Sequence, residues 1–171
     1  MHTISPASKI QANLQELFQA ESSPGKAYVR FSLNQELTVL FSMKQVQESL
    51  IVSADQITPL PGMPSAMIGM MNTRDRVFCV IDIAQLLTLP SSILLSRDYQ
   101  IIIIEDPASK KLIGFAVPQL LGITRLESES FKLPTSVPDS LIPFVIGCPK
   151  ELDQELIILD EAEIIKAASI H

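Results

Sequence analysis

The sequence predicts a mainly β protein built from two related β units. Three observations lead to this prediction. Short runs in which apolar and polar residues alternate recur along the chain, as they do in half-buried strands. Turn residues and proline-bearing loops separate these runs. A segment near the middle of the chain is repeated near its end with the same internal spacing, which indicates an internal duplication.

Composition limits the classes of protein that the chain can belong to. With 171 residues, of which 47% are hydrophobic and 19% charged, it fits one domain with a well-filled core. The formal net charge of −6 and the lack of a basic cluster argue against nucleic acid as a partner. No apolar run approaches the ~18 residues that cross a bilayer, and the N-terminus has no secretory pattern. We therefore expect a cytoplasmic protein without membrane insertion, in which Cys79 and Cys148 are buried thiols.

The N-terminal region predicts a helix followed by a linker, over residues 1–26. Between residues 6 and 20, four apolar residues recur at helical spacing: Ile10, Leu14, Leu17 and Phe18. Such a stripe packs against its own domain or docks onto a partner, and both alternatives stay open. The polar residues that follow, with Pro24 and Gly25, break the pattern. Residues 27–171 then form the main domain.

The strands of this domain follow from periodicity. Residues 27–33 and 37–43 alternate across a polar turn and predict an antiparallel hairpin with one buried face. Residues 58–64 contain three prolines, which lack N–H donors, and predict a loop outside any sheet. Residues 99–105 and 111–117 predict a second hairpin, and its unbroken run of isoleucines indicates burial on both faces. A further strand over 120–126 precedes a C-terminal strand, turn, strand and helix.

The duplication joins two segments that are 78 residues apart. Gly69 precedes Asp82 by 13 residues, and Gly147 precedes Asp160 by 13 residues, with apolar neighbours in register. Each aspartate ends a strand and precedes a helical pattern, so we expect both to be helix N-caps. Catalytic carboxylates are the alternative. The two glycines predict a close backbone approach or a bend within a strand.

An enzymatic function finds little support in the residues. The two histidines, His2 and His171, are the second and the last residue of the chain, where order is usually poor. They do not predict a nucleophile–histidine arrangement, and there is neither a cysteine–histidine spacing for zinc nor a glycine-rich phosphate loop. We expect no catalysis, no metal and no cofactor.

Several motifs in order resemble the CheW-like domain, the adaptor module of bacterial chemosensory arrays. They are Val46-x-Glu48, the proline-rich loop, the I-G-x-x-N-x-R pattern of residues 68–74 and the V-I-D-I pattern of residues 80–83. The resemblance covers residues 27–168. It implies two five-stranded SH3-like β-barrel lobes on a shared core. It also implies a non-catalytic scaffold that couples the helical hairpin tip of a methyl-accepting-type receptor to the regulatory domain of a CheA-type histidine kinase in the control of motility. The alternative is a β-barrel interaction module outside chemosensory signalling.

This chain departs from the family pattern at three places. Asp75 stands where the family usually has glycine, and Cys79 stands where it usually has proline. The V-D-x-V pattern of the second barrel reads Val-Pro-Gln-Leu over residues 117–120. We expect a divergent branch of the family with partners of its own.

The predicted protein-interaction site centres on the polar turn of residues 72–76, which the second copy of the repeat does not share. The resemblance implies contact roles for Val46, Glu48, Asn72 and Arg74, and position in the turn adds Asp75 and Arg76. An arginine on a tight turn can bind a carboxylate through two parallel hydrogen bonds. The alternatives for Arg74 are a solvated turn charge and an internal pair with Asp75 or Glu48.

Overall fold

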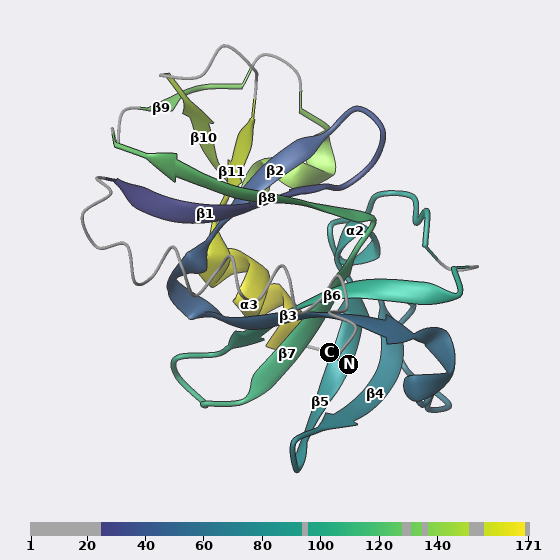
Figure 1. The fold of residues 1–171 in the computed structure, drawn as a ribbon. Helices are drawn as coiled ribbons and strands as arrows, with labels where there is room; N and C mark the ends of the chain where they lie inside the picture. Colours follow the sequence, from purple (N-terminus) through teal and green to yellow (C-terminus); the bar gives the residue numbers. More distant parts are fainter. Residues whose placement is uncertain (1–24, 94–95, 128–130, 135–136, 151–155, 170–171) are drawn as a thin grey trace, which may run out of the picture.

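The structure is a computed structural model. It describes residues 25–93, 96–127, 131–134, 137–150 and 156–169 (Figure 1). The helix predicted between residues 6 and 20 lies outside this part of the chain. Two sheets form two lobes, one above the other in Figure 1, with the C-terminal helix α3 (Glu161–Ser169) between them.

Lobe 1 is a sheet of six strands in the order β8-β1-β2-β11-β10-β9. β11 runs parallel to β2, and the other neighbours are antiparallel. Its strands are β1 (Lys26–Ser32), β2 (Thr38–Ser42), β8 (Gln119–Leu126), β9 (Phe131–Lys132), β10 (Val145–Pro149) and β11 (Ile157–Leu159).

Lobe 2 is a sheet of five strands in the order β3-β6-β7-β5-β4. β5 runs parallel to β7, and the other neighbours are antiparallel. Its strands are β3 (Val46–Ser53), β4 (Met67–Thr73), β5 (Arg76–Asp82), β6 (Asp98–Glu105) and β7 (Leu112–Val117). Short helices connect the strands: η1 (Met43–Gln45), η2 (Ala54–Gln56), α2 (Ile83–Leu86) and η3 (Asp139–Phe144).

Five strands follow the same order in both lobes, and this shared order explains the sequence repeat. β3, β6, β7, β5 and β4 of lobe 2 match β8, β1, β2, β11 and β10 of lobe 1. Irregular register, of the kind that a β-bulge produces, also recurs at matching places: in β4–β5 before Gly69 and in β10–β11 before Gly147. The lobes are nevertheless not consecutive halves of the chain. The hairpin β1–β2 comes first in the sequence but completes the lobe that contains β8, β10 and β11.

The predicted fold of two SH3-like β lobes is confirmed, and lobe 1 carries the two-residue strand β9 in addition to the five strands that match lobe 2. β9 pairs with β10 through Lys132 and Cys148. Lobe 2 has an isolated bridge at the matching place, between Thr58 and Met70, and Met70 lies 78 residues before Cys148. Thr58 thus pairs with a strand although it lies in the predicted proline loop.

Apolar side chains fill three clusters. One lies inside each lobe, and the largest lies between the lobes and includes residues of both sheets, α2 and α3. Phe41 of β2 and Phe115 of β7 hold equivalent positions in the two lobes, and their ring centroids are 6.4 Å apart in this shared core. The predicted single buried face is wrong for β2, because Leu40 is also fully buried inside lobe 1. The isoleucines of β6 are buried on both faces, as predicted.

Each repeated aspartate begins an α-helix, as the spacing predicts: Asp82 precedes α2 and Asp160 precedes α3. The Asp82 carboxylate accepts the Ala84 N–H at 3.1 Å. The Asp160 carboxylate accepts the N–H groups of Ala162 and Glu163 at 3.1 and 3.3 Å. Both aspartates are therefore helix N-caps and belong to the scaffold.

Candidate functional site

The predicted interaction turn is a two-residue connection at the tip of the hairpin β4–β5, which points away from lobe 1 (Figure 1). Asn72 still belongs to β4, and Arg76 begins β5. The turn proper consists of Arg74 and Asp75, both with positive φ angles, 48° and 66°. Two left-handed residues fit the right-handed twist of a hairpin, and glycine or asparagine is usual there. The predicted five-residue turn is thus shorter in the structure.

Arg74 extends from this tip over Glu48 of β3. Its guanidinium lies 3.8 Å from the Glu48 carboxylate, while 74% of the Arg74 side chain and 11% of the Glu48 side chain are exposed. Glu48 follows an irregularity in the β3–β6 register, where Val46 pairs with Ile104 and Glu48 with Ile103. The structure therefore combines two of the alternatives, because Arg74 is both solvent-exposed and paired with Glu48.

Arg76 joins the same cluster from the start of β5. Its guanidinium donates a hydrogen bond of 3.3 Å to the Lys110 carbonyl, in the turn between β6 and β7. Arg74, Arg76 and Glu48 line a hollow of about 190 Å³ together with Gln47, Thr73, Ile103 and Leu112. Two guanidinium groups and a nearly buried carboxylate thus surround one small surface hollow at the end of lobe 2.

The remaining predicted site residues lie outside the hollow. Asn72 and Asp75 are exposed on the hairpin, and Val46 is only 8% exposed in the core between the lobes. Val46 therefore belongs to the scaffold and anchors the start of β3 in the core between the lobes. The structure adds Val77, which pairs with Asn72 across the hairpin and leaves 65% of its surface in solvent. The site therefore presents an apolar side chain beside its charged tip.

Sequence reasoning missed Val77, Ile103 and Leu112, whereas Thr73 lies within the predicted turn of residues 72–76. Val77 alternates with Phe78 along β5 and looks like any other apolar strand residue. Its position beyond the end of the shared core, which leaves it exposed, is a property of the tertiary structure. Ile103 and Leu112 come from strands far away in the sequence, so no local pattern links them to the turn.

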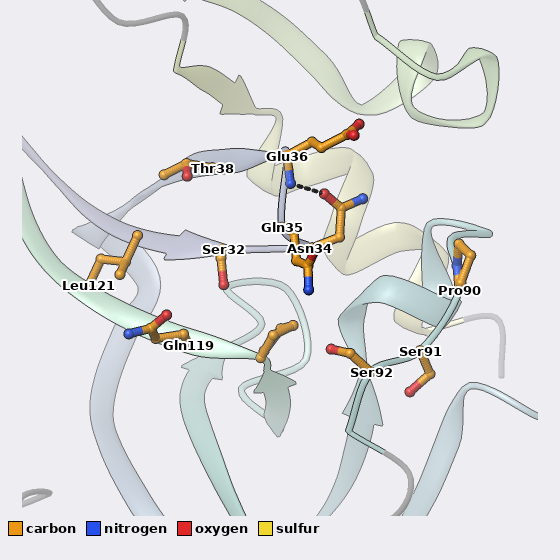
Figure 2. A pocket seen from close by; sticks show the side chains of 11 residues that line it. Ser32, Asn34, Gln35, Glu36, Thr38, Pro90, Ser91, Ser92, Gln119 and Leu121 are labelled. Atoms are coloured by element: carbon orange, nitrogen blue, oxygen red, sulfur yellow. Dashed lines mark hydrogen bonds between the residues drawn. The ribbon is translucent and has the colours of Figure 1, made fainter.

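A recess larger than this hollow lies beside the β1–β2 turn (Figure 2). It has a volume of about 730 Å³ and is lined by Ser32, Asn34, Gln35, Glu36, Thr38, Pro90, Ser91, Ser92, Pro118, Gln119 and Leu121. Asn34 shapes its rim, because its side-chain oxygen accepts the N–H groups of Glu36 and Leu37 at 2.8 Å each. This recess, whose lining includes the Glu36 carboxylate as well as polar and apolar side chains, contains none of the predicted site residues.

The buried ionisable groups do not form a reactive centre. Asp82 is fully buried and accepts a hydrogen bond from the Ser91 hydroxyl; burial raises the pKa of Asp82, and its hydrogen bonds oppose this shift. Burial also raises the pKa of the Cys79 thiol, which disfavours a reactive thiolate. Cys148 is buried as predicted, whereas Cys79 is partly exposed. Within the described ranges, no cluster of three acidic, histidine or cysteine side chains could hold a metal ion.

Two lobes that repeat one barrel around a shared core define a two-lobed β-barrel scaffold. The model of the CheW-like domain matches residues 27–169. The chain therefore belongs to the CheW-like domain family, whose members are non-catalytic scaffolds. The predictions of the family and of a non-enzymatic protein agree with this membership.

A solved structure supports the same assignment. The crystal structure of the scaffolding protein TtCheW from Thermoanaerobacter tengcongensis is 27% identical to this chain, with a TM-score of 0.65. The similarity covers 79% of this chain and 88% of TtCheW. The fold is thus that of a CheW-like scaffold with two SH3-like lobes. The search of curated proteins found no match. Among the described residues, no helix has the length and apolar character needed to cross a membrane.

Proposed function

We propose that this protein is a cytoplasmic adaptor that couples a methyl-accepting-type chemoreceptor to a CheA-type histidine kinase in a pathway controlling motility. The surfaces that it recognises are the kinase's regulatory domain and the receptor's helical hairpin tip. The hairpin β4–β5 is the central contact, and Arg74 is its principal residue. The observation that carries this proposal is the exposed Arg74 guanidinium, held above Glu48 on a CheW-like scaffold.

The geometry around Arg74 suits a partner that offers a carboxylate next to an apolar residue. A separation of 3.8 Å from Glu48 is long for a charge-assisted hydrogen bond, so a partner carboxylate can take over the guanidinium. Val77 offers exposed apolar surface two residues beyond the turn. Glu48 orients the arginine before binding, which lowers the entropy lost on association.

The test is the affinity of Arg74→Glu for the purified regulatory domain of the cognate kinase and for a receptor cytoplasmic fragment. An interface hot spot contributes about 2 kcal/mol or more, so we expect at least ~30-fold weaker binding to one of them. The melting temperature should change little, because 74% of the Arg74 side chain is exposed and solvent screens the interaction of this position with Glu48 to about 0–1 kcal/mol.

Arg97→Glu is the matched control. Arg97 is exposed and precedes β6, whose residue Asp98 pairs with Ser53 at the opposite end of β3 from Glu48. Arg97→Glu makes the same charge change away from the hairpin and should leave the affinity for both the kinase domain and the receptor fragment unchanged. If Arg74→Glu binds like the wild type with an unchanged melt, Arg74 is not part of the site. If the wild type binds neither partner at micromolar concentration, the adaptor role fails and an interaction module outside chemosensory signalling remains.

A further inference from the structure

A row of four paired residues crosses each lobe, and the two rows differ in charge. In lobe 2 the row runs Val80, Gly114, Ile103 and Glu48, from β5 through β7 and β6 to β3. In lobe 1 the matching row runs Ile158, Leu40, Arg30 and Gly122, from β11 through β2 and β1 to β8. Ile158 lies 78 residues after Val80, so the repeat itself aligns the rows. Arg30 therefore occupies the position of Ile103, and Gly122 that of Glu48.

Arg30 lies on the inner face of lobe 1. Residues paired directly across neighbouring strands point to the same face, and Leu40 and Ile158 belong to the cluster inside this lobe. Ile103, the counterpart of Arg30, is completely buried. Arg30 itself is half-buried, and its Nε atom has no contact with solvent. A guanidinium thus stands where the other lobe has an isoleucine.

This guanidinium has no counter-ion in the part of the chain that the structure describes. The buried Nε atom of Arg30 has no hydrogen-bond partner there, and neither of the ion pairs includes Arg30. Gly122, opposite Arg30, carries no side chain, and the space that a Cβ atom would face is free of described atoms within 4 Å. Lobe 2 places the Glu48 carboxylate at this same position and pairs it with Arg74.

A half-buried guanidinium without a partner is unfavourable, because it loses hydration and gains no charge-assisted hydrogen bond. An isoleucine at this position would fill the barrel at no such cost, as Ile103 shows. The arginine therefore suits a ligand that brings its own negative charge. Leu121, the neighbour of Gly122 in the irregular stretch of β8, is 39% exposed and lines the recess beside the β1–β2 turn.

We propose that Arg30 is a second partner-binding position, on lobe 1, which takes the aspartate or glutamate side chain of a protein partner. The partner's carboxylate enters the open space at Gly122 and binds the Arg30 guanidinium. It thereby takes the position in lobe 1 that the Glu48 carboxylate occupies in lobe 2. This inference rests on the proposed adaptor function and adds a contact on the opposite lobe from Arg74. The partner's acidic residue lies on the kinase regulatory domain or on the receptor, and separate binding experiments distinguish them.

The test compares Arg30→Ile with the wild type in two measurements on the full chain. Because the variant copies Ile103, we expect the melting temperature of the isolated protein to stay the same or rise. We expect the affinity for either the kinase regulatory domain or the receptor fragment to fall at least tenfold. Arg30→Lys keeps the charge but loses the bidentate geometry, and it should give an intermediate affinity. Arg97→Ile is the control for adding an isoleucine at an exposed arginine and should leave both affinities unchanged.

Three outcomes would overturn this inference. Unchanged affinity of Arg30→Ile for both proteins, while Arg74→Glu still weakens binding, removes Arg30 and leaves the proposed function intact. A lower melting temperature of Arg30→Ile that disappears in the background Glu151→Gln, Asp153→Asn, Glu155→Gln shows that the chain supplies the carboxylate itself. A wild type that binds neither protein removes the proposed function and this inference together.

Discussion

Replacement of Gly69 by alanine tests how the scaffold holds the interaction hairpin. Gly69 lies in β4, and a Cβ atom there would clash with the Thr58 carbonyl oxygen and stand 2.7 Å from the Thr58 carbonyl carbon. Both atoms belong to the backbone, so they cannot move aside as the end of a flexible side chain would. The contact involves the bridge by which the proline loop attaches to β4.

The expected cost follows from the bonds that this clash would break. Thr58 and Met70 exchange two backbone hydrogen bonds of 2.8 Å each. Each contributes about 0.5–1.5 kcal/mol net, so the loss of both costs about 1–3 kcal/mol. Ile57, whose Cγ2 atom would lie 3.0 Å from the new methyl group, is buried in the core of lobe 2 and would have to repack. We expect Gly69→Ala to lower the free energy of unfolding by about 2–3 kcal/mol.

Equilibrium urea unfolding of the full chain measures this change. Gly62→Ala is the control for adding a methyl group to the same loop, because no described atom lies within 4 Å of its Cβ position. It retains a cost from its positive φ angle of 77°, about 1 kcal/mol. A free energy of unfolding for Gly69→Ala that equals or exceeds that of Gly62→Ala would refute the assigned role of the close approach.

Two further predictions concern the turn and the buried carboxylate. Asp75→Gly should raise the free energy of unfolding by about 0.5 kcal/mol, because Asp75 has a φ angle of 66° that favours glycine; a urea titration showing destabilisation would contradict this. Burial raises the folded-state pKa of Asp82 above 3.8, so its contribution to stability is full below that pH and is lost as the pH rises through the folded pKa. As the pH rises above 3.8, the free energy of unfolding of the wild type should therefore fall relative to that of Asp82→Asn. A rise of the wild-type value relative to that of the variant would contradict this explanation.

The sequence predicted the elements that depend on local patterns. Alternating residues located most strands, and the repeated Gly69–Asp82 and Gly147–Asp160 spacing gave both the duplication and the two helix caps. These predictions succeeded because side-chain periodicity and capping involve residues close together in the chain. The prediction of one buried face for β2 failed, because a strand between two packed clusters buries both faces whatever its alternation suggests.

The sequence predicted the central pair of the candidate site, Glu48 and Arg74, but not how the surrounding residues are placed. The resemblance to the CheW-like family gave Glu48 and Arg74, which the structure brings to 3.8 Å. It could not show that Val46 lies in the core, or that Arg76 reaches the Lys110 carbonyl. The burial of Val46 and the contact of Arg76 with Lys110 depend on which strands pair to close each barrel. The separation of residues along the sequence does not predict this pairing.

The sequence by itself determined that this protein is a duplicated β scaffold with a unique charged hairpin in one copy. The tertiary structure decided how the two copies share their strands: the N-terminal hairpin β1–β2 completes the lobe of the C-terminal strands. The same exchange sets Arg30 opposite Gly122, although 92 residues separate them in the chain. Local pattern fixes which face of a strand an apolar residue occupies, whereas pairing between distant strands decides which charges meet.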